Sequence, residues 1–249
     1  MITADPPVRQ CGAAALVRFS RLAPMERQDL AILKRATEDY RCVEAGTEIA
    51  RESERTPRKL LLLRGWIAFQ RVFADGRRQI VGFALPGEVF GRGSAAHTTA
   101  LTSHVAVDKV SFCTAPDPAG RPSLELAYAR DQLAQWRNLI DHTVRLGRMD
   151  ARERVCDLLL ELHERLLLSG EASENAFRVP LTQEWLADVV GLTPVHLNRT
   201  LQACRRDGIL SWQGKNVVLH DPAAIARFVG RKPERIDLSA PLPQMSNAG

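Results

Sequence analysis

The chain has 249 residues, of which 45% are hydrophobic, and its formal net charge is +5 at pH 7. Such a chain can bury a sizeable core in one or two domains, and no run approaches the roughly 18 apolar residues of a membrane span. Five cysteines without C-x-x-C spacing indicate neither a disulfide framework nor a zinc site.

The first half of the chain is predicted to be mainly β-structure. A loose arm over residues 1–15 and a short amphipathic helix within 16–36 precede it. From Tyr40 the hydrophobic period changes to two, and Asp75-Gly76 suits the positive φ angles of a hairpin turn. About eight short strands separated by turns are typical of a β-roll or jelly roll. The predicted strands are 40–43, 47–51, 59–64, 67–73, 79–85, a short one after Pro86-Gly87, 103–107 and 109–114.

A long helix is predicted over residues 123–148. Its apolar residues recur with the a/d spacing of a coiled coil, so we expect it to pair with a second copy of the chain. The alternative is a helix lying on its own β-roll, because only three heptads are visible. The a and d positions are Leu126, Ala129, Leu133, Trp136, Ile140 and Thr143, and the expected dimer contacts are Leu126, Leu133, Trp136 and Ile140.

The next helix follows a predicted hinge at residues 147–150. Asp150 and Glu153 have the spacing of a capping box. Apolar residues at helical spacing then form a stripe that we expect to pack under the C-terminal domain. These residues are Val155, Leu158, Leu159, Leu162 and Leu166.

Two short helices joined by a tight turn are predicted within residues 182–202. Gly191 stands where the chain must reverse, and glycine adopts the left-handed conformation that ends a helix. Thr193 followed by Pro194 is an N-cap with proline at the first helical position. The pattern is that of a helix-turn-helix. Its inward-facing apolar residues are Leu186, Ala187, Val190, Leu197 and Leu201.

The outward face of the second helix carries side chains suited to DNA bases. Arg199 can make a bidentate pair with guanine, Asn198 can bond to adenine or phosphate, and Val195 can touch a thymine methyl. Together with Pro194 these are the expected base-reading residues. The alternative is an ordinary helical hairpin with a solvated polar face.

A strand, a turn and a second strand are predicted from residue 211 to residue 220. This hairpin is the wing of a winged helix, and Lys215 at its tip is placed to meet a phosphate. Residues 178–232 contain eight Lys or Arg and four Asp or Glu. The basic excess therefore lies with the helix-turn-helix, as a polyanion partner requires.

These features together resemble the Crp/Fnr superfamily of transcription regulators. The likeness rests on the Asp75-Gly76-Arg77 hairpin, the PGEVFG turn, the long helix, and LTQEWLADVVGLTPVHLNRTLQACRRDGIL, and it covers roughly residues 16–229. It implies an α+β fold: a cyclic-nucleotide-binding-like β-roll over 16–122, a dimerisation helix over 123–148 and a winged helix-turn-helix over 149–230. The tail over 231–249 is expected to be disordered.

The resemblance also implies partners. They are a second copy of the chain, a palindromic double-stranded operator with half-sites about 34 Å apart, and RNA polymerase, which would face the loop at 169–175. The oxygen-sensing branch carries Glu-x-x-Ser-Arg on its recognition helix, and Val195, Asn198 and Arg199 stand there in this chain, so only the arginine is kept. The phosphate contacts expected from the family are Thr182, Gln183, Thr193, His196, Gln213 and Lys215.

The effector residues depart from the family pattern. Members that bind cyclic AMP have a Gly-Glu pair for the ribose and an Arg-Ser pair for the phosphate. Arg92 follows Gly91 here, and residues 96–105 contain no arginine. A buried phosphate without a cationic partner is costly, so we do not expect cyclic-nucleotide binding by the usual route, and the effector pocket is unknown.

We expect no metal or cofactor. The iron-sulfur branch needs three thiolates near the N-terminus, where this chain has only Cys11. His97 and His104 are available to a haem, but we expect them to be solvated. The N-terminus lacks an apolar signal segment, and we expect a cytoplasmic bacterial protein.

The sequence also bears on three other functions: an enzyme, an effector-binding module and a regulator controlled by thiol oxidation. The chain lacks a glycine-rich phosphate loop, H-E-x-x-H and G-x-S-x-G, so we do not expect an enzyme. A β-roll that binds an effector and regulates a protein partner is one alternative. Thiol control is another: Cys204 shares the inward face of Leu197, and its oxidation would disturb the recognition helix.

Overall fold

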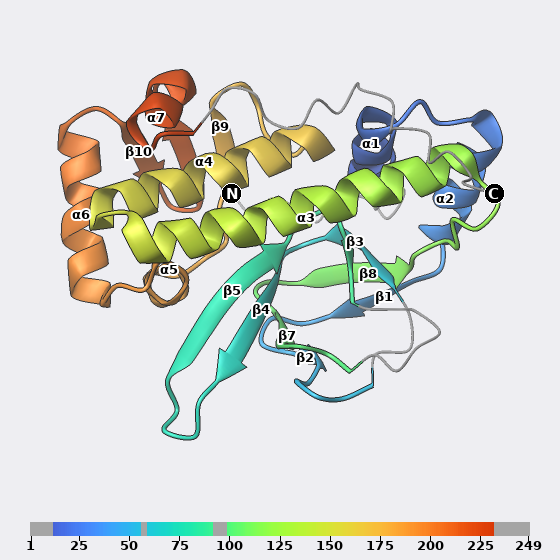
Figure 1. The fold of residues 1–249 in the computed structure, drawn as a ribbon, viewed down its shortest axis with the longest axis horizontal. Helices are drawn as coiled ribbons and strands as arrows, with labels where there is room; N and C mark the ends of the chain where they lie inside the picture. The colour runs from blue at the N-terminus through green and yellow to red at the C-terminus, as the bar shows by residue number, and fades with distance from the viewer. Residues whose placement is uncertain (1–11, 56–58, 92–98, 232–249) are drawn as a thin grey trace, which may run out of the picture.

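The computed structural model describes residues 12–55, 59–91 and 99–231. It has an N-terminal β-roll with two short helices, a long helix that crosses the molecule, and a C-terminal helix-turn-helix domain (Figure 1). The α+β fold expected from the sequence is therefore confirmed. The helices are α1 (Ala13–Leu22), α2 (Arg27–Ala36), α3 (Pro122–Arg148), α4 (Ala151–Ser169), α5 (Gln183–Val190), α6 (Pro194–Arg206) and α7 (Pro222–Phe228).

The β-roll consists of two four-stranded antiparallel sheets, with the orders β1-β8-β3-β6 and β2-β7-β4-β5. The predicted strands form with small shifts at their ends, and turns at Gly46, Gly65, Gly76 and Gly87 separate four pairs of consecutive strands. They are β1 (Tyr40–Val43), β2 (Glu48–Ala50), β3 (Leu60–Arg64), β4 (Ile67–Val72), β5 (Arg78–Ala84), β6 (Val89–Phe90), β7 (Ser103–Ala106) and β8 (Val110–Thr114).

The N-terminal helical region differs from the prediction of one helix within 16–36. The first helix begins earlier, at Ala13, and ends at Leu22, and a second begins at Arg27. Ala23 is extended, with φ −152° and ψ 156°, because the residue before a proline is driven out of the helical region, here by Pro24. The predicted arm therefore contributes helix from Ala13, and residues 1–11 lie outside the described part.

The interior of the β-roll is filled by aromatic rings. His104 on β7 lies 4.8 Å from Phe69 and 6.1 Å from Phe90, ring centroid to ring centroid, and Phe90 lies 6.0 Å from Phe112. The expectation of a solvated His104 is wrong: the residue is 7% exposed. Successive residues of a strand face opposite sides, and His104 is on the side of β7 that faces the interior. Burial lowers the pKa of His104 to about 4.

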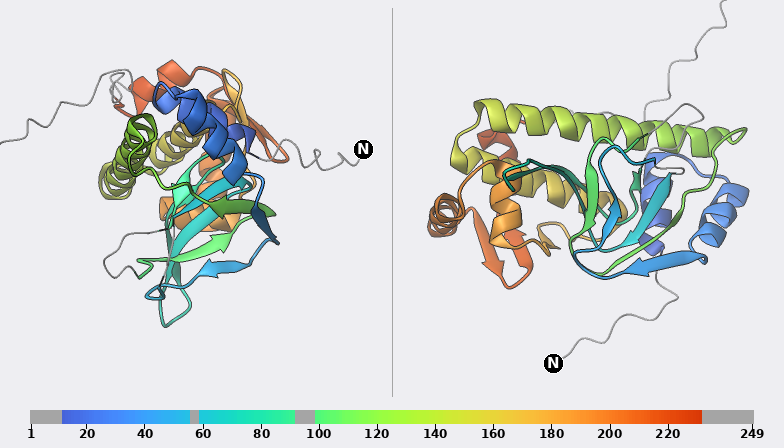
Figure 2. Two further views of the ribbon diagram at one scale, coloured as in Figure 1. Left: turned by 90° about the vertical axis from the view of Figure 1, so that its right-hand side faces the viewer. Right: turned by 90° about the horizontal axis from the view of Figure 1, so that it is seen from below.

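Helices α3 and α4 form an antiparallel pair, and Figure 2 shows them lying side by side over the β-roll. The chain reverses at Met149. The predicted capping box is present: Asp150 N donates to Glu153 Oε2 at 2.8 Å, and Glu153 N donates to Asp150 Oδ1 at 2.9 Å. The predicted apolar stripe of α4 is buried throughout. No helix of the described chain is long and apolar enough to cross a membrane.

A chain of buried, alternating charges connects the β-roll to α3 and α4. Glu88, in the turn between β5 and β6, accepts hydrogen bonds from Arg165 of α4 at 2.7 and 3.0 Å and lies 3.5 Å from Arg18 of α1. Burial alone would raise the pKa of Glu161, but Arg145 and Arg165 lower it to about 2. In order, the members are Asp131, Arg18, Glu88, Arg165, Glu161, Arg145, Asp157 and Arg231, whose side chains are at most 9% exposed.

We expect acid to destabilise the folded chain partly through His104. The folded state keeps this ring neutral down to about pH 4, whereas its ordinary pKa is 6.5, so protons bind the unfolded chain first and stability falls as the pH drops through this window. Between about pH 7.5 and 4.5, the free energy of unfolding of His104→Phe should fall by about 2 to 3 kcal/mol less than that of the native chain. Urea unfolding of both proteins at the two pH values measures the effect.

Part of the acid sensitivity should persist in His104→Phe. Burial and the neighbouring Arg145 lower the pKa of His142 to about 4 as well, and this residue is unchanged in the variant. An equal loss of stability in the native chain and in His104→Phe would contradict the assignment.

Candidate nucleic-acid interface

The helix-turn-helix is formed by α5 and α6, as predicted. Gly191, at φ 64°, ends α5 in the left-handed conformation, and a Cβ there would meet Leu146 Cδ2 at 3.2 Å. Leu192 N donates to Ala187 O at 3.0 Å and closes the turn. Glycine is therefore needed both for the backbone conformation and for the close approach of α3.

Hydroxyl groups cap both helices of the motif. Thr182 Oγ1 accepts from Trp185 N at 3.4 Å, and Thr193 Oγ1 accepts from His196 N at 3.2 Å. Pro194 occupies the first turn of α6, where the missing N–H costs no helical hydrogen bond. Thr193 and Pro194 thus define where the recognition helix begins, and the first turn of this helix is exposed.

The predicted base-reading residues lie near one another on the free side of α6. Pro194 and Arg199 are exposed, Val195 is 66% exposed, and Asn198 is half-buried. The Val195 side chain is thus accessible to a partner. The residues predicted to meet phosphate are also exposed: Thr182, Gln183, Thr193, His196, Gln213 and Lys215.

The predicted wing is present as the hairpin of β10 (Leu210–Gln213) and β11 (Asn216–Leu219). Lys215 lies at its tip, where Gly214 has φ 60° and its carbonyl accepts from Trp212 Nε1 at 3.0 Å. The sequence interpretation missed β9 (Ala176–Arg178), which pairs with β11 and makes a three-stranded sheet. It also missed α7, which Asp221 caps by accepting from Ala224 N at 2.8 Å.

The β-roll holds the first helix of the motif directly. Arg78 of β5 pairs with Asp188 of α5 at 2.6 Å and lies over the Trp185 ring, 4.4 Å from its centroid. Gln79 Nε2 donates to the Asp188 carbonyl at 3.0 Å. Behind these contacts, apolar residues of the β-roll such as Trp66 and Phe83 share one core with α4, α5 and α6. The position of α6 is thus set partly by the β-roll.

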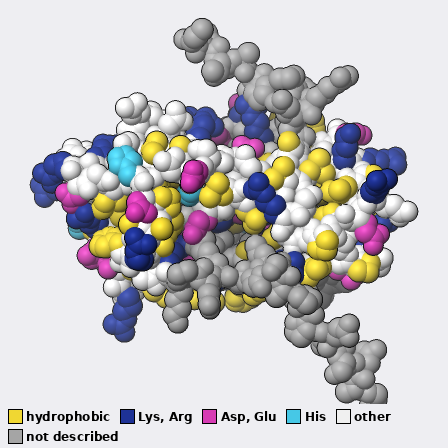
Figure 3. All heavy atoms as spheres, turned by 90° about the horizontal axis from the view of Figure 1, so that it is seen from above, with side chains coloured by type: hydrophobic (Ala, Val, Ile, Leu, Met, Phe, Trp, Pro, Cys, Tyr) yellow, Lys and Arg dark blue, Asp and Glu magenta, His cyan; other side chains and the backbone are white. Residues whose placement is uncertain are grey.

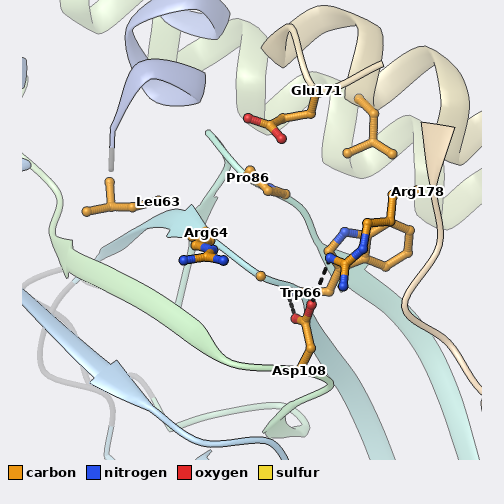
Figure 4. Close-up of a pocket in the computed structure, with 9 residues that line it drawn as sticks. Leu63, Arg64, Trp66, Pro86, Asp108, Glu171 and Arg178 are labelled. Carbon is orange, nitrogen blue, oxygen red and sulfur yellow. Dashed lines mark hydrogen bonds and ion pairs between the residues drawn. The ribbon is translucent and has the colours of Figure 1, made fainter. Parts of the chain in front are cut away.

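A small cavity of about 120 Å³ lies where the β-roll meets the C-terminal domain (Figure 4). Asp108 closes one side: its Oδ1 accepts from Trp66 N at 2.8 Å, and its Oδ2 lies 3.5 Å from Arg178 Nη1. Burial raises the pKa of Glu171 on the other side. The cavity is well below the roughly 300 Å³ of common ligand pockets.

The expected departures from the cyclic-AMP pattern stay predictions. Arg92 and the first part of the 96–105 segment lie outside the described residues, as do Cys11 and His97. Figure 3 shows Lys and Arg side chains spread over this face of the molecule, including the end that α6 forms. This is the charge that binding to a phosphate backbone requires.

Comparisons with known proteins cover both halves of the chain. Residues 153–228 match the Crp-like helix-turn-helix domain, and residues 40–119 match the cyclic nucleotide-binding domain. The nitrogen fixation regulation protein FixK of Bradyrhizobium diazoefficiens is 35% identical over 190 residues, 73% of this chain and 78% of that protein.

Two further similarities extend over most of the molecule. The transcriptional activator protein FnrL of Cereibacter sphaeroides is 27% identical over 238 residues, 90% of this chain and 93% of its own length. The structure of FixK2 from Bradyrhizobium japonicum superposes with a TM-score of 0.65 at 26% identity, over 76% of this chain and 96% of that chain.

We expect Thr193→Ala to lower the free energy of unfolding by about 1 kcal/mol, because the His196 N–H loses its acceptor at the start of α6. Thr193→Ser keeps the hydroxyl and should retain most of the stability. Urea unfolding followed by circular dichroism compares the two variants with the native chain. If the alanine and serine variants are equally stable, the cap does not support the recognition helix.

Proposed function

This chain belongs to the Crp/Fnr family of DNA-binding transcription regulators, and we propose that it acts as a homodimer whose two recognition helices read a palindromic operator. The observation that carries the proposal is the exposed, capped first turn of α6 with Arg199 beside it. FixK and FnrL are named as regulators, which supports the same class of activity. We expect it to act where the DNA is, in the bacterial cytoplasm.

The free face of α3 supports the homodimer. Leu133, Trp136 and Ile140, three of the four predicted contacts, are 46%, 57% and 58% exposed. Leu139 and Val144, which the heptad interpretation left out, widen the same apolar stripe at 47% and 46% exposure. A stripe of large apolar side chains along one helix marks an interaction surface.

The fourth predicted contact is placed differently. Leu126 is half-buried and packs against the core formed with α1. Its seam position lies at the start of α3, where the helix rests on its own β-roll. Both interpretations of the helix therefore describe part of it: the first turns pack within the chain, and the proposed dimer contact begins near Leu133.

A two-fold axis along the free face of α3 would present α6 of each copy to successive turns of the major groove. Thr193, His196 and Lys215 would contact phosphate, whereas Arg199 would read guanine through its two N–H donors. RNA polymerase is the further partner we propose, through the loop at 169–175. The sequence at Arg92 and over 96–105 supports binding without cyclic AMP.

The experiment that tests the function is selection of double-stranded DNA from a random pool by the purified full chain, without ligand and in reducing buffer. Recovery of one palindromic sequence with half-sites one helical turn apart is the expected result. Recovery of unrelated sequences, or of none, would overturn a ligand-independent, sequence-specific dimer.

Arg199→Ala should weaken binding to the selected operator by about 1 to 3 kcal/mol and relax the preference at one base pair, because a bidentate guanine contact is lost. Lys215→Ala is the matched control: it removes a charge at the wing tip and should weaken binding about equally for all sequences. Titration of both variants against the operator and its single-base substitutions measures the difference. Uniform weakening by Arg199→Ala would make it a phosphate contact instead.

Ile140→Glu should convert the dimer into a monomer, because a carboxylate would be buried against the apolar stripe of the second copy. Sedimentation equilibrium should then give a mass of 27.7 kDa in place of twice that value. Gln28→Glu, which adds the same charge on the exposed side of α2, should leave the mass unchanged. A dimeric Ile140→Glu would exclude the proposed contact.

A further inference from the structure

Two buried cysteines from different helices meet beneath the recognition helix. The Sγ atoms of Cys156, on α4, and Cys204, on the last turn of α6, lie 4.0 Å apart, and the two residues are 1% and 0% exposed. They are 48 positions apart in the chain, so no local spacing reveals the pair. The sequence interpretation placed Cys204 inward, which is confirmed, but gave it no partner.

The other described cysteines lack such a thiol neighbour. Cys42 lies on the surface of the β-roll, with its sulfur 3.2 Å from Ser111 Oγ. Cys113 is buried, and burial raises its pKa to about 12. Only the α4–α6 pair, among the described residues, joins two elements of the DNA-binding domain through sulfur.

We propose that Cys156 and Cys204 form a redox site that a hydroperoxide oxidises to a disulfide, fixing the recognition helix to α4. The Cys204 sulfur attacks the distal peroxide oxygen, the O–O bond breaks, and an alcohol or water leaves while a sulfenic acid forms. The Cys156 sulfur then displaces the sulfenic acid oxygen, which leaves as water. Two thiols are oxidised by two electrons, the peroxide is reduced, and both thiol protons end in the released molecules.

The surroundings favour Cys204 as the attacking sulfur. The hydrogen bond from Cys156 lowers the pKa of Cys204 against the opposing effect of burial, and the charge of Arg152 adds to the lowering. The same hydrogen bond and burial raise the pKa of Cys156. Arg152 lies one turn before Cys156 on α4, and its Nε is buried without an acceptor among the described residues. A nearby cation and an ionisable thiol are the features of reactive cysteines.

An exposed ion pair joins α4 to the end of α6, the two elements that carry the thiol pair. Arg152 Nη2 pairs with Asp207, the C-cap of α6, at 2.6 Å, and these side chains are 37% and 48% exposed. Ion pairs this exposed contribute only about 0 to 1 kcal/mol. Cys204 is in the last turn of α6, where helices fray, so a water-sized peroxide needs only a local opening.

We expect disulfide formation to move the recognition helix. The sulfur atoms have to approach from 4.0 Å to about 2.05 Å. Helix α4 is held by the buried charge network through Asp157, the neighbour of Cys156, so the movement falls on the end of α6. If the proposed function holds, this movement displaces Arg199 from the base edge and weakens operator binding.

The first test needs no DNA. The reduced full chain is treated with hydrogen peroxide, the remaining thiols are alkylated, and peptides are mapped by mass spectrometry without reduction. We expect a linked Cys156–Cys204 peptide, lighter by two hydrogens, that disappears on reduction. Two alkylated peptides, or sulfinic acid on Cys204 with no link, would overturn the proposal.

The second test measures DNA binding and rests on the proposed function. With the operator selected in reducing buffer, oxidation should weaken binding at least tenfold in the native chain, and reduction should restore it. Cys156→Ala and Cys204→Ala should each bind equally before and after oxidation. Cys113→Ala, which removes a buried thiol from the β-roll, should respond like the native chain.

The two tests separate the possible failures. A linked peptide from a protein that selects no operator in reducing buffer would overturn the proposed function and leave the redox site intact. A linked peptide with unchanged operator affinity would overturn the displacement of α6. Circular dichroism confirms that each alanine variant is folded, and Cys156→Ser provides a second variant if an alanine variant is not.

Discussion

The buried ion network is the interaction on which the arrangement of this molecule depends. Glu88 lies at the centre of the network, because its carboxylate forms ion pairs with both Arg18 of α1 and Arg165 of α4. One carboxylate thus connects a turn of the β-roll to the DNA-binding domain. Removing one partner of such a buried pair typically costs about 3 to 5 kcal/mol, because the other charge remains desolvated. The network therefore helps to fix the relative position of α3, α4 and the β-roll.

Helix α4 transmits this fixed position to the DNA-binding surface. One side of it carries Glu161 and Arg165 into the network, and the other side packs Val155 and Leu159 into the core that contains α5 and α6. The apolar stripe predicted from the sequence therefore accounts for one side of α4, and the charged network accounts for the other. A single rigid helix places the recognition helix relative to α3, and hence relative to the free face through which we propose that a second copy binds.

The local elements could be predicted because their signals are local. Gly191, Thr193 and Pro194 define the turn and the start of α6 within four residues, and the predicted β-hairpins have their turn residues at their tips. Contacts between residues far apart in the chain could not be predicted in this way. Arg18 occurs in an amphipathic helix where a charge is expected outside, and its acceptor Asp131 is 113 positions away. Likewise, Cys156 and Cys204 each fit an apolar stripe, which conceals that the two stripes meet.

The ion pair that joins α5 to the β-roll is more exposed than the ion pairs that hold α4. Arg78 and Asp188 are 28% and 30% exposed, in the range where solvent reduces an ion pair to about 1 kcal/mol or less. Arg145 and Asp157, each 1% exposed, belong to the costly buried class. These ion pairs therefore resist separation of α4 from α3 more strongly than separation of α5 from β5. The α4–α6 cysteine pair lies in the core that α4 shares with α5 and α6, so a covalent link there would act between the helix held by the buried charges and the recognition helix.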